Sequence, residues 1–198
     1  MNPSLRIGVA DDEPEMLDYY QQTLSSLGHE VVAKAPTGAQ LVEQCKAAHP
    51  DLVITDIKMP DKDGLDAAIE ISRDKPTPVV LVSAYYDNDL INRALQDHVL
   101  AYLIKPIKQA DLETAIALAM RRFQEFQALH KQSDDLRQAL EDRKIVERAK
   151  GSIMTRSGLD EQTAFRRLQK MAADKNLKLV EVARTILLAE EAYQTNKH

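Results

Sequence analysis

The 198-residue sequence is poor in cysteine and in aromatic residues: it has one cysteine, no tryptophan and 5% aromatic residues in all. Because Cys45 stands alone, the chain can form neither an intramolecular disulfide framework nor a zinc site built from several cysteines. No apolar run approaches the length of a membrane-spanning helix, roughly 18 residues, and the N-terminus lacks the apolar segment of a signal peptide. We therefore expect a cytoplasmic protein with no membrane partner.

The chain does contain enough apolar residues for packed domains. Apolar residues make up 44% and charged residues 29%, which is typical of a globular protein and argues against a fully disordered chain. The net charge of −5 is unevenly divided, because residues 1–140 carry −8 and residues 141–198 carry +3. This asymmetry predicts two modules that face different partners.

Five short apolar runs alternate with segments of helical periodicity over the first hundred residues. Such an alternation is typical of a parallel sheet covered by helices on both faces. The predicted fold class is therefore α/β, with a five-stranded doubly wound parallel sheet. The expected strands are residues 5–10, 31–33, 52–55, 79–82 and 100–104, and the expected helices are residues 14–27, 37–48, 65–72 and 89–96.

The character of the sequence changes from Gln109 onward. No proline or glycine occurs between Pro106 and Gly151, which predicts a linker helix of about 35–40 residues. Further helices are expected at residues 145–156, 161–173 and 180–193, forming a small three-helix C-terminal domain. The predicted domains are accordingly residues 1–122, a helical coiled-coil linker at 123–143, and residues 144–198.

Apolar residues in the linker recur at the 3-4-3-4 spacing of a coiled coil. The seam consists of Phe126, Leu129, Leu136 and Leu140, with Ser133 at one seam position. This pattern predicts a homodimer formed through the linker helix. The alternative is a helix that lies on its own domain, because a seam of about two heptads is short.

Polar residues follow the predicted strands at the ends that meet at one edge of the sheet. They are Asp11 and Asp12 after the first strand, Asp56 after the third, Ser83 after the fourth and Lys105 after the fifth. Three carboxylates brought together repel one another, so we expect Mg²⁺ to bind there, and the site could accept phosphate on a carboxylate. Taken singly, each aspartate has the alternative of a helix cap or turn residue, and Lys105 that of a surface residue.

Residues 5–122 resemble the receiver domain of bacterial two-component response regulators, which has a flavodoxin-like fold. The order and spacing of four motifs carry the resemblance: Asp11-Asp12-Glu13-Pro14, Asp56-Ile57-Lys58-Met59-Pro60-Asp61-Lys62-Asp63-Gly64, Ser83-Ala84 and Lys105-Pro106. The resemblance implies that a sensor histidine kinase is the partner that supplies the phosphoryl group. It implies no other enzymatic reaction beyond the receiver's own phosphorylation and dephosphorylation.

The resemblance also implies a role for individual residues. Asp56 is the implied phosphoacceptor, and Asp11, Asp12 and Asp56 arrange Mg²⁺ together with the backbone carbonyl of Lys58. Lys105 contacts the phosphoryl group through an ammonium that follows the fifth predicted strand. In members of the family the bond that corresponds to Lys105–Pro106 is commonly cis. Ser83 and Tyr102 are the implied switch pair, in which the hydroxyl of Ser83 moves toward the phosphoryl oxygens and Tyr102 fills the space it leaves.

The C-terminal segment resembles the ANTAR domain, a small three-helix RNA-binding module that follows receivers in some bacterial regulators. The matching residues are Ala149-Lys150-Gly151-Ser152-Ile153-Met154, Ala164-Phe165 and Val182-Ala183. The resemblance implies binding to paired short hairpins in nascent RNA and a role in transcription antitermination. Helices that only dimerise the chain or bind a protein are the alternative, and DNA binding is a weaker one.

Basic residues gather in this C-terminal segment, and phosphates attract such side chains. Guanidinium planes can also stack on the exposed bases of hairpin loops. The alternative for each cation is an ordinary solvated helix face. The candidate RNA-binding residues are Lys150, Arg156, Arg166, Arg167, Lys170 and Arg184.

Overall fold

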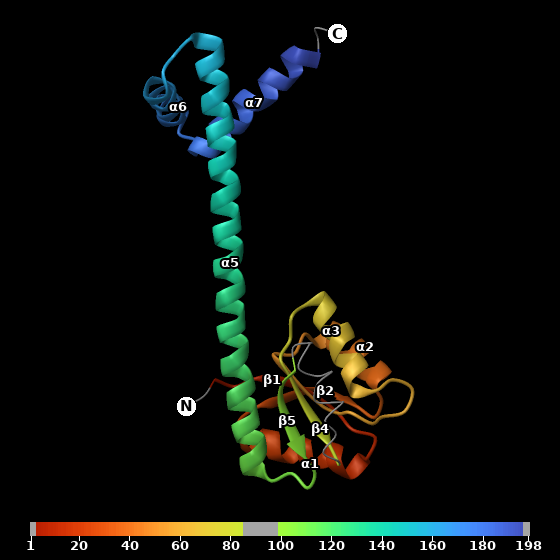
Figure 1. The fold of residues 1–198 in the computed structure, drawn as a ribbon. Helices are drawn as coiled ribbons and strands as arrows, with labels where there is room; N and C mark the ends of the chain where they lie inside the picture. Colours follow the sequence, from red (N-terminus) through yellow and green to blue (C-terminus); the bar gives the residue numbers. More distant parts are fainter. Residues whose placement is uncertain (1–2, 85–98, 196–198) are drawn as a thin grey trace. The chain divides into compact units, whose positions relative to one another are not determined.

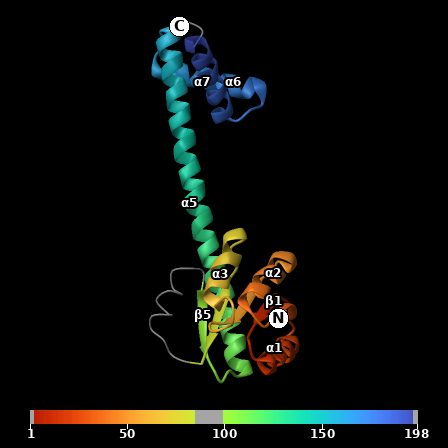
Figure 2. The ribbon, with the colours of Figure 1, turned by 90° about the vertical axis from the view of Figure 1, so that its right-hand side faces the viewer.

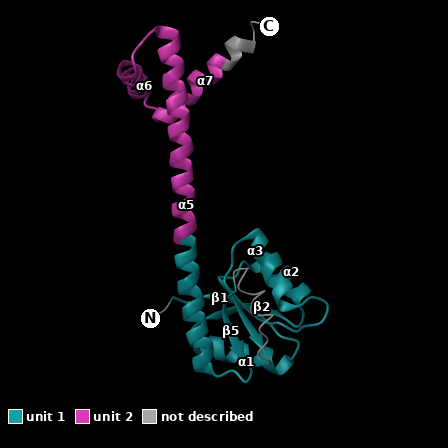
Figure 3. Cartoon of the chain, in the orientation of Figure 1, with its two compact units in different colours: residues 1–127 teal, residues 128–198 magenta. Residues whose placement is uncertain are grey.

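The computed structural model describes residues 3–84 and 99–195, with side chains up to Glu190. The helix expected at residues 89–96 lies outside these ranges. Within them the chain divides into two compact units, residues 1–127 and 128–198 (Figure 3).

The first unit is built on a five-stranded parallel sheet in the order β2-β1-β3-β4-β5 (Figure 1). This order places β3 at the centre and changes the winding direction between β1 and β3, as in flavodoxin-like folds. The predicted fold class is confirmed. The strands are β1 (Arg6–Ala10), β2 (Glu30–Ala35), β3 (Leu52–Asp56), β4 (Val79–Ser83) and β5 (Val99–Ile104).

Two apolar layers cover the sheet, which explains why β3 and β4 are apolar except at their carboxyl ends. One core combines sheet residues with Leu41 of α2 (Gly38–Ala48) and Leu65 of α3 (Gly64–Asp74). The other core combines the opposite face with Leu24 of α1 (Pro14–Ser26) and Leu112 of α5 (Gln109–Ser157). Every residue of β3 and β4 is therefore buried.

Helix α5 is longer than the sequence predicts. It runs without a break over 49 residues, so the segment 145–156, expected as a separate helix, is its last part. Gly151 lies inside the helix, where it costs only about 1 kcal/mol relative to alanine. The helix ends before Gly158, whose φ of +62° is a left-handed conformation that glycine adopts without steric cost.

The second unit packs the last turns of α5 against α6 (Glu161–Lys175) and α7 (Leu179–Thr195) (Figure 2). Asp160 caps α6 by accepting a hydrogen bond from the Thr163 amide, and Asn176 ends it in a left-handed conformation. The buried core contains Ala149, Ile153, Ala164, Leu168, Ala172, Val182 and Ala183. In residues 3–84 and 99–195, none of the helices is long and apolar enough to cross a membrane.

Candidate functional site

Parallel pairing brings the polar residues that follow the strands to one edge of the sheet. Ala10 pairs with Thr55, so Asp11 and Asp56 come next on neighbouring strands. The ladder between β4 and β5 pairs Ser83 with Ile104, and the Lys105 amide donates to the carbonyl of Ser83 at 2.8 Å. Residues separated by up to 94 positions in the sequence thus meet because their strands are parallel and in register.

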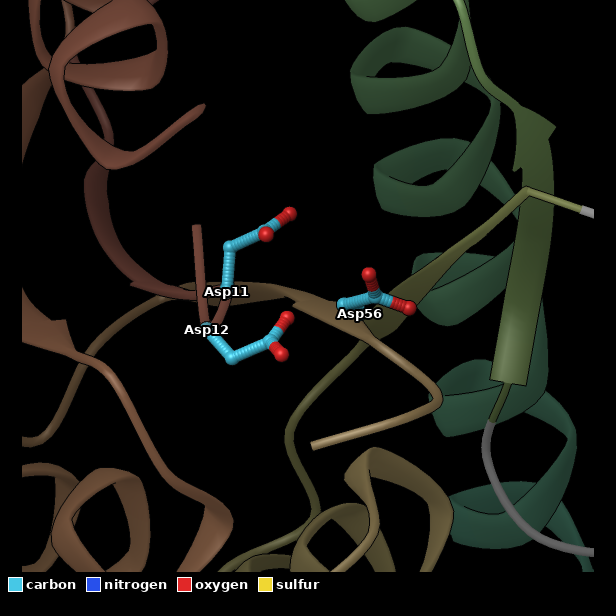
Figure 4. Close-up of side chains that lie close together, drawn as sticks. All are labelled: Asp11, Asp12 and Asp56. Carbon is cyan, nitrogen blue, oxygen red and sulfur yellow. The ribbon is translucent and has the colours of Figure 1, made fainter. Parts of the chain in front are cut away.

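Three carboxylates form the centre of this site (Figure 4). Asp11, Asp12 and Asp56 each offer an oxygen within 4.8 Å of the others. Asp11 and Asp56 are buried, whereas Asp12 is exposed, so one side of the cluster is open to solvent. Oxygen-only donors that are open to water on one side fit Mg²⁺, which binds few protein carboxylates and keeps several waters.

Lys105 places an ammonium group among these carboxylates. Its Nζ lies 2.8 Å from Asp56 Oδ2, 3.0 Å from Asp11 Oδ2 and 3.1 Å from Glu13 Oε1. The Lys105 side chain is 14% exposed and Asp11 and Asp56 are buried, so the charges of these three groups interact in surroundings with little water. The cation offsets the repulsion between Asp11 and Asp56 and lies where it can contact any group bound to Asp56.

Burial and pairing act in opposite directions on the pKa values at this site. For Lys105, burial lowers the pKa, but the hydrogen bonds to Asp56, Asp11 and Glu13 outweigh it, and the pKa is raised above its usual range. For Asp11, burial raises the pKa, and the hydrogen bond from Lys105 offsets only part of that rise. Burial likewise raises the pKa of Tyr20, whose hydroxyl lies 3.5 Å from Asp11 Oδ2 beneath the site.

The loop after β3 is held close to Asp56. The amide of Lys58 donates to Asp56 Oδ1 at 3.1 Å, and the amide of Gly64 donates to the carbonyl of Ile57 at 2.8 Å. A Cβ at Gly64 would collide with the carbonyl oxygen of Asp56, so only glycine fits there. Asp61 has a φ of +66°, which turns the loop tightly. The loop therefore fixes the peptide of Lys58 next to the acidic cluster.

The two residues of the expected switch pair lie on adjacent strands. Ser83 is buried at the end of β4, and Tyr102 is half-buried in β5, where it packs against the core formed by α2 and α3. The Lys105–Pro106 bond that follows β5 is cis.

Sequence reasoning missed Glu13 and Tyr20 as neighbours of the site. Glu13 could have been found because it directly follows the aspartate pair, whereas Tyr20 reaches Asp11 only through helix packing.

The candidate RNA-binding residues differ in their surroundings. Arg166, Arg167 and Lys170 are exposed on α6, where their spacing places them on one side of the helix. Arg167 Nη1 donates to Ser157 Oγ at 3.2 Å. Arg156 is exposed near the end of α5, and Arg184 of α7 lies 3.5 Å from Asp142 Oδ1. Lys150 is buried and ion-paired, unlike the exposed cation that the sequence predicts.

The expected coiled-coil seam lies on α5 with its apolar side chains exposed. Leu129 is 66% exposed, and Leu136 and Leu140 are each about as exposed. Phe126 is also exposed. A row of exposed leucines at this spacing is unusual on a helix that has water on all sides, because such side chains gain free energy when they are covered.

Family models match both units. A model described as "Response regulator receiver domain" matches residues 7–117, and one described as "ANTAR domain" matches residues 134–187. The first covers the sheet and the acidic cluster, and the second covers the core shared by α5, α6 and α7.

Individual relatives match the chain over different lengths. The chain is 40% identical over 182 residues to the transcriptional regulatory protein PdtaR of Mycobacterium tuberculosis, covering 92% of this chain and 89% of PdtaR. It is 38% identical over 107 residues to the chemotaxis protein CheY of Bacillus subtilis, covering 54% of this chain and 88% of CheY. Among solved structures, a receiver domain protein from Clostridium thermocellum matches with a TM-score of 0.56 and 31% identity, covering 61% of this chain and 98% of that one.

Proposed function

Because the chain belongs to the two-component response regulators that join a receiver domain to an ANTAR domain, we propose that phosphorylation of Asp56 controls RNA binding by its C-terminal unit. The observation that carries the proposal is the juxtaposition of Asp56 with Lys105 and two further aspartates at one sheet edge. We propose residues 1–122, 123–143 and 144–198 as the receiver, linker and RNA-binding modules, acting in the cytoplasm.

The phosphoryl group would come from a phosphohistidine of a sensor histidine kinase. A bond forms between phosphorus and a carboxylate oxygen of Asp56 while the bond from phosphorus to the histidine nitrogen breaks. Lys105 binds a phosphoryl oxygen from its position 2.8 Å from Asp56. Mg²⁺ held by Asp11, Asp12, Asp56 and the carbonyl of Lys58 would supply additional positive charge. Hydrolysis of the acyl phosphate reverses the modification.

The phosphoryl group adds charge and hydrogen-bond acceptors beside β4 and β5. The hydroxyl of Ser83 moves to donate to these acceptors, and Tyr102 turns into the space that opens. These changes shift the equilibrium between two conformations of the surface around β5. Supporting this proposal, Ser83 is buried at the edge of the site and Tyr102 lies on the adjacent strand.

The C-terminal unit would bind paired RNA hairpins through the exposed cations of α6 and thereby prevent transcription termination. Arg166, Arg167 and Lys170 supply the main contacts, and Arg156 and Arg184 lie on the neighbouring helices. The guanidinium groups can contact phosphates and stack on unpaired bases of hairpin loops.

Two copies of the chain would pair through the exposed seam of α5. Each leucine of the seam is covered by the partner helix in such a dimer. Two RNA-binding units joined in this way bind two hairpins on one transcript with an increased effective concentration. A dimer that forms through these leucines is equally compatible with the alternative that the C-terminal helices serve dimerisation or protein binding alone.

Measurement of RNA affinity separates these alternatives. The double substitution of Arg166 and Arg167 to glutamine should weaken binding of the full chain to a synthetic two-hairpin RNA by at least about 10-fold. The slope of log affinity against log salt should also decrease by about 0.7–0.9 per lost phosphate contact. The matched control, Glu190→Gln, changes a half-buried α7 residue and should bind as the wild type does. A wild-type chain that dimerises and binds no hairpin RNA would favour the protein-binding alternative.

A further inference from the structure

Lys150 joins two helices of the C-terminal unit through ion pairs with two exposed glutamates. It lies on α5 between the core residues Ala149 and Ile153, and its side chain is only 11% exposed. Its Nζ lies 2.7 Å from Oε1 of Glu161, the first residue of α6, and it also pairs with Glu147 one turn back on α5. The contact between Lys150 and Glu161 therefore spans the turn between α5 and α6.

This ion pair belongs to a set of contacts that fix where α6 begins. The connection is short, because α5 ends at Ser157 and α6 begins at Glu161. Gly158 turns the chain in a left-handed conformation, and Asp160 caps the first turn of α6. Arg167 of α6 reaches back to the Ser157 hydroxyl at 3.2 Å. Among the described side chains, Lys150 makes the only charged contact between the interior of α5 and this first turn.

The surroundings of Lys150 do not suit direct contact with an RNA phosphate. Its ammonium is shared by two carboxylates, so the group of three carries a net negative charge that repels phosphate. To bind a phosphate, the ammonium would have to give up its contacts with these carboxylates. Glu161 is meanwhile well placed, because a carboxylate is stabilised near the N-terminus of a helix.

We propose that Lys150 is a positioning residue for RNA binding: its ion pair with Glu161 holds α6 in the orientation that presents Arg166, Arg167 and Lys170 to the RNA. This inference rests on the proposed function that the C-terminal unit binds RNA. It assigns to Lys150 no contact with the RNA.

The substitution Glu161→Gln gives opposite results for the two roles of Lys150. It removes a negative charge, so a lysine that contacts phosphate would be released and RNA binding would become tighter and more dependent on salt. If Lys150 positions α6, the same substitution weakens the affinity for the two-hairpin RNA by about 10-fold, because the interhelix contact is lost. The slope of log affinity against log salt stays unchanged, because no phosphate contact is lost.

Three further variants of the full chain complete the test. Lys150→Met should weaken binding to the same extent with an unchanged slope, and Lys150→Arg should retain wild-type affinity because it keeps both carboxylate partners. Glu147→Gln is the matched control: it removes a carboxylate from the same lysine but leaves the contact with Glu161, so affinity should remain within about twofold of wild type. Fluorescence anisotropy with labelled RNA over a salt series measures both quantities.

Hydrogen exchange gives a readout that does not depend on RNA. Glu161→Gln and Lys150→Met should speed amide exchange in the first turns of α6 relative to Glu147→Gln. Tighter RNA binding by Glu161→Gln, or a reduced salt slope for Lys150→Met, would overturn the positioning role while the proposed function stands. If the wild type binds no hairpin RNA, the proposed function fails, and the exchange rates still decide whether Lys150 holds α6.

Discussion

The two units each contain a lysine that is largely buried among carboxylates. The side chain of Lys105 in the first unit is 14% exposed, and that of Lys150 in the second is 11% exposed. In both lysines, hydrogen bonds to carboxylates raise the pKa of the ammonium group and outweigh the lowering effect of burial. Charge and burial alone would therefore assign the two lysines the same role.

The difference lies in where the carboxylates come from. Asp11 and Asp56 are fixed at the ends of neighbouring parallel strands, and the exposed Asp12 opens their cluster to ligands from solvent. Glu147 and Glu161 come from two consecutive helices, so the lysine between them connects those helices. The same pairing of a lysine with carboxylates thus forms a candidate reaction site where aspartates meet at one sheet edge, and an interhelix contact where glutamates come from two helices.

The largest expected difference between the two lysines is in the rate at which their variants are phosphorylated. Asp56→Asn should eliminate labelling of the chain by a small phosphodonor, because the attacking carboxylate is gone. Lys105→Met should slow labelling by about 100-fold or more, because a charged donor to the phosphoryl oxygens is lost. Lys150→Met should leave the rate unchanged, since its carboxylates belong to the other unit.

Rates of phosphorylation at fixed Mg²⁺ and donor concentrations provide this measurement. Asp61→Asn serves as the control for Asp56→Asn, because it changes an exposed aspartate of the same loop. Equal rates for Lys105→Met and the wild type would remove Lys105 from the reaction. A slow Lys150→Met variant would mean that the two units are coupled in the phosphorylation step itself.

A smaller effect separates core from surface leucines in the second unit. Leu168 is fully buried, so Leu168→Ala should lower the free energy of unfolding of this unit by about 2–5 kcal/mol. Leu136 is exposed, so Leu136→Ala should change that free energy by less than about 0.5 kcal/mol in the monomer while weakening self-association.

Urea denaturation, monitored by hydrogen exchange in α6 and α7, measures the free energy of unfolding. Sedimentation equilibrium measures self-association. A large loss of monomer stability in Leu136→Ala would mean that the seam packs within one chain. That result would support the alternative of a linker helix lying on its own domain.

The sequence was sufficient to predict the acidic site because its geometry depends on strand order and strand ends. Apolar runs mark β1, β3, β4 and β5, and in a parallel sheet the residues that follow them meet at one edge. The predicted positions of Asp11, Asp56 and Lys105 agree with the structure for this reason. The contact between Tyr20 and Asp11 was not predictable, because it depends on how α1 packs against the sheet.

The second unit was harder to predict because the burial of a cation depends on tertiary packing. Lys150 belongs to a basic, helical segment, and nothing in its spacing distinguishes it from the exposed Arg166. Its partner Glu161 lies 11 residues away, beyond a turn whose direction is set by Gly158. Similarly, Gly151 suggests a break in α5, yet the helix continues through it.

The central claim is that phosphorylation of Asp56 controls RNA binding, and a comparison of affinities tests it most directly. The affinity of the full chain for the two-hairpin RNA should be measured with and without acetyl phosphate in the presence of Mg²⁺, for the wild type and for Asp56→Asn. We predict that phosphorylation tightens binding by the wild type by about 5-fold or more and leaves Asp56→Asn unchanged. Equal affinities of phosphorylated and unphosphorylated wild type would contradict the account.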